Sequence, residues 1–170
     1  MQTEKINCQI EYEIMKPGEE LQVIDVVIST FDEFVAPQYS VEGVCEFRKY
    51  ANVVALAERS LSNHFTVIAK KDGRAVGVIE VKEFNHVSML FVKKDFQNIG
   101  IGKNLFHMAA DVCLKNRPNL KRLTVNASPN SVHAYKKIGF IPDDTEQLVN
   151  GIRFIPMSRA LQTRVLEDGN

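Results

Sequence analysis

A short glycine-containing loop is the feature of this sequence best suited to holding an anion. Residues 97–102 read Gln-Asn-Ile-Gly-Ile-Gly. The glycines at 100 and 102 carry no Cβ, so backbone N–H groups of the loop can converge on one point. The residues that follow have the spacing of an amphipathic helix, whose N-terminus adds partial positive charge: Leu105, Phe106, Ala109, Val112 and Cys113. The pattern predicts a phosphate or pyrophosphate site, although glycines that only cap a helix also produce it.

Two other phosphate-binding patterns fit this loop less well. The sequence has no Gly-x-x-x-x-Gly-Lys-Ser/Thr run, which a P-loop nucleotidase requires. A dinucleotide-binding fingerprint would need a third glycine near Phe106. The loop therefore indicates neither of these nucleotide sites.

The segments before the loop indicate the sheet that holds it. Three runs of β-forming residues lie within residues 65–92, at Phe65–Ala69, Ala75–Val81 and His86–Val92. Asp72-Gly73 between the first two is a strong hairpin signal. We expect an antiparallel meander whose last strand leads directly into the glycine loop.

The remaining elements alternate between strands and helices. Cys8 to Ile14 alternate as in a half-buried strand, with Cys8 as a core residue, and residues 21–35 have helical apolar spacing that ends near Pro37. Val41 to Leu61 indicates one broken helix or two short ones. After the loop helix, which stops before Pro118, we expect a strand at 122–127, a helix at 131–138 and a strand at 152–157. The order predicts one mixed α/β domain over residues 1–170.

Composition excludes several classes of function. Lys plus Arg number 21 and Asp plus Glu also number 21, so no net positive field favours nucleic acid or an anionic membrane. No apolar run is long enough to span a bilayer or to resemble a secretory leader, and we expect a cytoplasmic protein. The three cysteines, Cys8, Cys45 and Cys113, form no CxxC pair, so we expect neither a disulfide framework nor a metal site.

Two motifs together make the sequence resemble the GCN5-related N-acetyltransferase family. Gln97, Gly100 and Gly102 match that family's Gln/Arg-x-x-Gly-x-Gly/Ala signature, and Tyr135 stands four residues before Gly139-Phe140, as in its helix-to-strand motif. The preceding Met89 to Val92 looks like the family's fourth strand, and the resemblance runs from about 65 to 160. It implies a mostly antiparallel sheet of six to seven strands flanked by helices, with strands four and five splayed apart.

The same resemblance implies acetyl-coenzyme A as the acyl donor. It would lie between the splayed strands, with its pantetheine arm along the fourth strand, its pyrophosphate on the loop amides, and Lys103 or Lys137 near its 3′-phosphate. The residues implied to bind it are Leu90, Phe91, Val92, Gln97, Asn98, Ile99, Gly100, Ile101, Gly102, Lys103, Asn126, Tyr135 and Lys137.

Acetyl transfer to an amine implies a set of catalytic groups. An alkylammonium with a pKa of about 10 must first lose a proton. An amide near Leu90 or Phe91 resembles the family's carbonyl-binding group, and Tyr135 resembles its general acid, although Tyr135 packing under the cofactor is the simpler alternative. Residues 86–92 contain no acid, so Glu80 and His86 are the nearest candidates for the base, and a water relay to bulk solvent is the default.

No sequence pattern on the acceptor side of the site specifies the acceptor. Glu146 is a candidate to bind an amine cation, and the first helix with residues 41–60 would form the rest of the acceptor wall. The expected partner is a primary amine of a small molecule or peptide, and a homodimer is compatible with the family. A non-catalytic acyl-coenzyme A sensor and a transferase for another acyl group remain alternatives.

Overall fold

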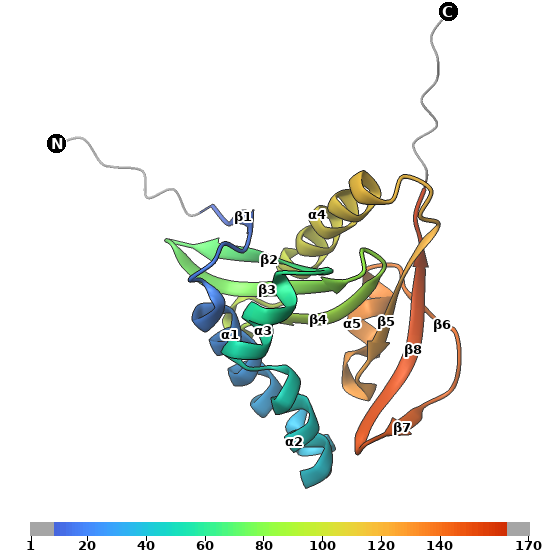
Figure 1. Ribbon diagram of the computed structural model, residues 1–170. Helices are drawn as coiled ribbons and strands as arrows, with labels where there is room; N and C mark the ends of the chain where they lie inside the picture. The colour runs from blue at the N-terminus through green and yellow to red at the C-terminus, as the bar shows by residue number, and fades with distance from the viewer. Residues whose placement is uncertain (1–8, 163–170) are drawn as a thin grey trace, which may run out of the picture.

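One twisted sheet organises residues 9–162, which are the residues that this computed structural model describes (Figure 1). Its strand order is β1-β2-β3-β4-β5-β8-β6, with β7 paired to β8. Within the described residues, β4 and β5 form the only parallel pair. The strands are β1 (Glu11–Ile14), β2 (His64–Lys71), β3 (Arg74–Lys82), β4 (His86–Val92), β5 (Arg122–Ala127), β6 (Ile141–Pro142), β7 (Gln147–Val149) and β8 (Ile152–Ala160).

The expected mixed α/β architecture is confirmed, with one difference in the number of strands. The described residues hold eight strands rather than six to seven. The additional strands, β6 and β7, span two and three residues, too few for a periodic pattern to show. The Cys8 prediction lies outside the described residues, whereas Cys113 is fully buried as expected, and burial raises the pKa of its thiol to about 12.

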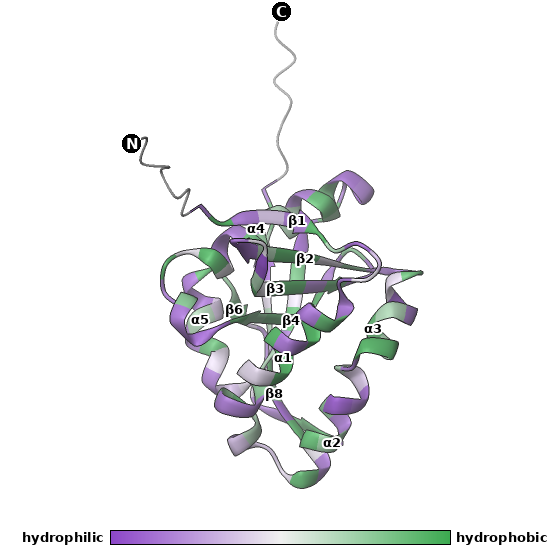
Figure 2. Cartoon of the chain, turned by 90° about the vertical axis from the view of Figure 1, so that its left-hand side faces the viewer, coloured by the Kyte–Doolittle hydropathy of each residue, from purple (hydrophilic) through white to green (hydrophobic). Residues whose placement is uncertain are grey.

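Three helices cover one face of the sheet: α1 (Glu20–Phe34), α2 (Val41–Tyr50) and α3 (Val53–Ser60). Val23, Val27 and Leu56 from α1 and α3 pack with Ile68, Val78 and Met89 of the sheet. Figure 2 shows α1 crossing in front of the hydrophobic strands β3 and β4. The 41–61 segment forms two helices because Asn52 caps α3, its side chain accepting a hydrogen bond from the Ala55 amide at 2.9 Å.

The opposite face carries α4 (Ile101–Asn116). Its Leu105, Phe106 and Ala109 pack with Val76, Ile79 and Leu123. Gly77 on β3 permits this contact, since a Cβ there would lie 3.1 Å from Ile101 Cγ2 and 3.2 Å from Leu105 Cδ1. The close approach fixes the first turn of α4, and therefore the glycine loop, against the sheet.

A hairpin closes the far end of the domain against α2. Asn150 and Gly151 join β7 to β8 with φ values of 52° and 77°, as a two-residue type I′ turn requires. Gly151 lies directly against the first turn of α2, because a Cβ on Gly43 would fall 2.1 Å from the Gly151 carbonyl oxygen. The remaining helical elements are α5 (Val132–Lys137) and the 3-10 turns η1 (Ala36–Gln38), η2 (Lys94–Phe96) and η3 (Pro129–Ser131). No helix among residues 9–162 is long and apolar enough to cross a membrane.

Candidate active site

The two parallel strands β4 and β5 separate after a short paired region. They pair only at His86 with Thr124 and at Val87 with Val125. Ser88 is an extra residue in β4, because Glu80 of β3 pairs with Met89 while Val81 pairs with Val87. A bulge of this kind bends its strand. The bend coincides with the point where β4 leaves β5, and the predicted splay is present.

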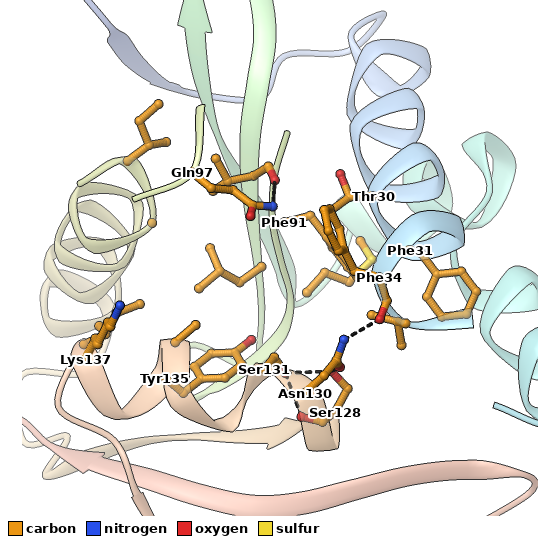
Figure 3. Close-up of a pocket in the computed structure, with 18 of the residues that line it drawn as sticks. Thr30, Phe31, Phe34, Phe91, Gln97, Ser128, Asn130, Ser131, Tyr135 and Lys137 are labelled. Carbon is orange, nitrogen blue, oxygen red and sulfur yellow. Dashed lines mark hydrogen bonds between the residues drawn. The ribbon is translucent and has the colours of Figure 1, made fainter. Parts of the chain in front are cut away.

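A cavity of about 570 Å³ opens at this gap (Figure 3). It is lined by α1, α2, β4, the loop before α4, the end of β5, η3 and α5. The structure brings together almost all the residues predicted to bind the donor: Leu90, Phe91, Val92, Gln97, Asn98, Gly100, Ile101, Gly102, Lys103, Asn126, Tyr135 and Lys137. Ile99 is the exception, with its side chain outside the lining and 66% exposed.

The glycine loop presents unpaired backbone donors to this cavity. Gln97 ties the loop to β4, its Nε2 donating to the Val92 carbonyl at 2.9 Å. Asn98 and Gly100 adopt positive φ values of 61° and 93°, and Gly100 caps α4 with no side-chain acceptor. The amides of the first helical turn have no partner within the helix. The loop therefore has the geometry of an anion site at a helix N-terminus.

The backbone of β4 supplies further groups to the gap. Lys93 N donates to Val76 O at 2.9 Å, while the Val92 carbonyl accepts from the Gln97 side chain rather than from β3. Because successive residues of a strand turn their backbone groups to opposite sides, Leu90 and Val92 face the gap and Phe91 faces β3. Phe91 contributes its ring to the cavity instead.

Tyr135 places a protonated hydroxyl in the cavity. Its ring is 7% exposed and packs edge-on against Phe140 with centroids 5.4 Å apart. Figure 3 shows the hydroxyl pointing into the cavity, and no described residue hydrogen-bonds to it. Burial raises the pKa of Tyr135 above its usual value near 10, so the phenol keeps its proton at neutral pH. The group is a free hydrogen-bond donor.

Glu80 lies in a buried cluster outside the cavity lining. Its carboxylate is fully buried, accepting from the Tyr50 hydroxyl at 2.5 Å and from Arg59 Nε at 2.9 Å. Arg59 also stacks over the Tyr50 ring, 3.7 Å from its centroid. Desolvation raises the pKa of Glu80, against the opposing effects of Arg59 and Tyr50. The cluster joins α2 and α3 to β3, and it gives Glu80 no direct contact with the cavity.

His86 also lies outside the cavity lining. It stands at the paired end of β4, where its Nδ1 is 2.7 Å from Thr124 Oγ1. Burial and the nearby Lys82 lower the pKa of His86, so the ring is neutral at neutral pH. Because His86 does not reach the cavity directly, its role as a base stays a prediction.

Glu146 does not line the cavity but is connected to a lining residue through Arg153. Its carboxylate pairs with Arg153 at 2.7 Å, and the Arg153 carbonyl accepts from the hydroxyl of Tyr39, which does line the cavity. The predicted acceptor-binding role of Glu146 stays a prediction.

The first helix and residues 41–60 were expected to form a wall of the site, but the aromatic side chains that line the cavity there were not identified from the sequence. Phe31, Phe34, Tyr39 and Phe47 line it, from α1, the end of η1 and α2. Phe31 had the spacing of an ordinary core residue, and the density of aromatic residues between 31 and 47 was the available signal. Across the mouth, Asn130 Nδ2 donates to the Phe34 carbonyl and joins η3 to the end of α1 (Figure 3).

No cluster of His, Cys, Asp or Glu suited to a metal ion occurs within residues 9–162.

Comparison with known proteins identifies the family of this chain. Residues 35–161 match the family described as acetyltransferase (GNAT) domain. A GCN5-related N-acetyltransferase structure from Rhodopseudomonas palustris superposes with a TM-score of 0.74 at 22% identity, covering 89% of this chain and 95% of its own. The PaiA N-acetyltransferase of Thermoplasma acidophilum, in complex with coenzyme A, gives 0.74 at 22%, covering 90% and 99%. Spermidine N-acetyltransferase from Vibrio cholerae, with coenzyme A and spermine, gives 0.58 at 16%, covering 91% and 96%.

At these identities the structural likeness shows a shared fold, and the family match over residues 35–161 shows membership. The chain belongs to the GNAT acetyltransferase family.

Proposed function

We propose that the chain is an N-acetyltransferase that moves the acetyl group of acetyl-coenzyme A directly to a primary amine in this cavity. One observation carries the proposal. The buried, protonated Tyr135 hydroxyl has no described hydrogen-bond partner and points into the cavity at the gap between β4 and β5. That arrangement suits a general acid for a leaving thiolate.

The residues of the loop fit the phosphate part of the donor. The uncapped amides at the start of α4 would accept the pyrophosphate, and Lys103 and Lys137 line the same cavity with positive charge. A Cβ at Gly102 would meet protein atoms only at 4.0 Å, so packing within the chain does not require glycine there. The absence of a side chain at Gly102 leaves the backbone open to close approach by a ligand. The coenzyme A in the Thermoplasma and Vibrio structures supports this assignment.

The residues of the gap fit the pantetheine and thioester part. The Leu90 and Val92 backbone groups would pair with the amides of the pantetheine arm as an added strand does, and Asn126 lies across the gap at the end of β5. A Leu90 amide turned toward the gap would polarise the thioester carbonyl. The donor supplies an activated acetyl group, and the chain supplies its orientation.

The transfer balances as follows. A neutral amine nitrogen forms a bond to the acetyl carbon, the carbon–sulfur bond breaks, and Tyr135 gives its proton to sulfur. The nitrogen then loses its surplus proton, and Tyr135 regains one. The lining among residues 9–162 contains no carboxylate and no imidazole, so we assign proton removal to water that connects the cavity with bulk solvent.

The test is release of free thiol from acetyl-coenzyme A in the presence of separate pools of monoamines, polyamines, amino acids and peptides. Release that depends on the amine, with an acetylated product of matching mass, would support the proposal. Tight binding of coenzyme A without release across all pools would instead identify an acyl-coenzyme A sensor. Faster release from succinyl-coenzyme A than from acetyl-coenzyme A would assign a different acyl group.

A further inference from the structure

A group of aromatic side chains lines the cavity on the side of α1 and α2. We call Phe31, Phe34, Tyr39, Phe47 and Phe91 the aromatic wall. Phe31 stacks on Phe47 with centroids 3.9 Å apart, and its edge meets Tyr39 at 5.7 Å. Phe47 in turn meets Phe91 at 6.1 Å. These contacts hold four of the rings together, and Figure 3 shows Phe34 and Phe91 across the cavity from Tyr135.

The aromatic wall offers no negative charge to an acceptor. Within residues 9–162, no Asp or Glu lines the cavity. The carboxylates at the end of α1, on α2 and before β7 lie outside the lining, and several are paired with basic side chains: Asp32 with Arg48, Glu33 with Lys94, Glu46 with Lys49 and Glu146 with Arg153. Exposed pairs of this kind add little stability, yet each places a positive charge beside the negative one. A polycation therefore meets no negatively charged cavity.

The polar side chains within and beside the aromatic wall are uncharged; several already donate to backbone carbonyls, whereas the buried Ser88 hydroxyl in the lining has no described partner. Thr30 Oγ1 donates to the Val26 carbonyl at 2.7 Å, and the Tyr39 hydroxyl donates to the Arg153 carbonyl at 3.2 Å. The Asn130 amide donates to the Phe34 carbonyl. A second ammonium group on an acceptor would lose its hydration at this wall and gain only uncharged hydrogen-bond acceptors, with no carboxylate to pair with it, which is costly. A hydrocarbon or ring would gain from the same contact.

From these observations we infer that the acceptor is a primary amine carried on an apolar, ring-sized skeleton, and that polyamines are poor acceptors. The inference rests on the proposed transfer to an amine and specifies its substrate class. It differs from the spermine found with the Vibrio protein, with which this chain shares the fold at 16% identity. The apolar surroundings also favour the neutral, reactive form of the amine, since desolvation disfavours an ammonium ion.

The experiment compares 2-phenylethylamine with putrescine and spermidine as acceptors in the thiol-release assay. All three present a primary amine on an alkyl chain, and they differ in the ring and in the number of charges: one, two and three. We expect kcat/KM for 2-phenylethylamine to exceed that for putrescine by at least about tenfold, because a buried phenyl group is worth that factor or more. A wild-type protein that prefers putrescine or spermidine would overturn the inference.

Phe34 allows a matched pair of variants. It is the last residue of α1, is only partly buried and takes no part in the ring contacts of Phe31, so its replacement leaves the stack intact. Phe34→Asp places a carboxylate in the aromatic wall and should lower the preference for 2-phenylethylamine at least about tenfold, in part by raising kcat/KM for putrescine. Phe34→Asn introduces a side chain equal in size to Asp but uncharged. It should lower kcat/KM for 2-phenylethylamine without raising kcat/KM for putrescine. Equal behaviour of the two variants toward putrescine would contradict the charge argument.

Failure of the proposed function would give a different result from failure of this inference. If no amine releases thiol, the proposed transfer is wrong. Calorimetric titration of the protein–coenzyme A complex with 2-phenylethylamine and putrescine then decides the inference by itself. Tighter binding of 2-phenylethylamine supports the inference, and equal or tighter binding of putrescine refutes it.

Discussion

Replacement of Tyr135 by Phe separates acid catalysis from packing. The phenyl ring keeps its edge contact with Phe140, whose centroid lies 5.4 Å away, and no described residue loses a hydrogen bond. The free energy of unfolding should therefore change by less than about 0.5 kcal/mol. A coenzyme A thiol is only moderately basic, with a pKa of about 8.5 if it resembles cysteine, so water can protonate it at some cost. We expect kcat to fall tenfold or more, equivalent to about 1.4 kcal/mol or more.

The assay follows thiol release at saturating acetyl-coenzyme A, with the dissociation constant of coenzyme A measured by calorimetry. That constant should stay within a factor of about two, because the proposed phosphate contacts lie on the loop and not at Tyr135. Tyr12→Phe is the matched control, since the Tyr12 hydroxyl only accepts from Asn104 and lies outside the cavity lining. Burial raises the pKa of Tyr135, so the wild type should lose activity through this group only above pH 10, and the variant should lack that alkaline limb. An unchanged kcat in Tyr135→Phe would refute the acid role.

Three further substitutions test the scaffold. Gly100→Ala places a Cβ at φ 93° and should cost about 1–2 kcal/mol in urea unfolding, and wild-type stability would contradict the left-handed loop. Arg59→Met leaves the Glu80 carboxyl buried without its cationic partner, with an expected loss of about 3–5 kcal/mol that a second change, Glu80→Met, largely restores; thermal melts in which the double variant is no more stable than the single one would count against the ion pair. Gly43→Ala drives a Cβ to 2.1 Å from the Gly151 carbonyl and should separate α2 from the hairpin, lowering the melting temperature by several degrees, whereas an unaltered melting temperature would show that the contact yields.

The donor side of the cavity could be predicted from the sequence because its determinants are local. Gln97, Gly100 and Gly102 lie within six residues, and their conformations follow from glycine chemistry at a helix start. Tyr135 is fixed by its spacing to Gly139-Phe140. The hairpin between β7 and β8 also had a local signal, Asn150-Gly151, although the flanking strands are too short for their periodicity to show.

The segments opposite the loop, the first helix and residues 41–60, could be predicted, but not which of their side chains line the cavity, because that depends on contacts between distant segments. Phe31, Phe47 and Phe91 come from three elements and meet only after the helices pack on the sheet. Glu80 occupies a strand position whose side chain often faces solvent. The cluster with Tyr50 and Arg59 buries it there, which no spacing within β3 indicates.

The extra residue at Ser88 also changes which residue numbers face each side of the sheet along β4. Before it, the odd-numbered Val87 faces α4; after it, the odd-numbered Met89 and Phe91 face α1. Side chains in a strand alternate with a period of two, so without Ser88 the adjacent Val87 and Met89 would still lie on opposite faces and β4 would pair with β3 in a single register. Phe91 would stay opposite Val78, on the α1 side, and only the bend would be lost. The pairing with β3 therefore sets the face that Phe91 occupies, and the extra residue sets the direction in which β4 leaves β5.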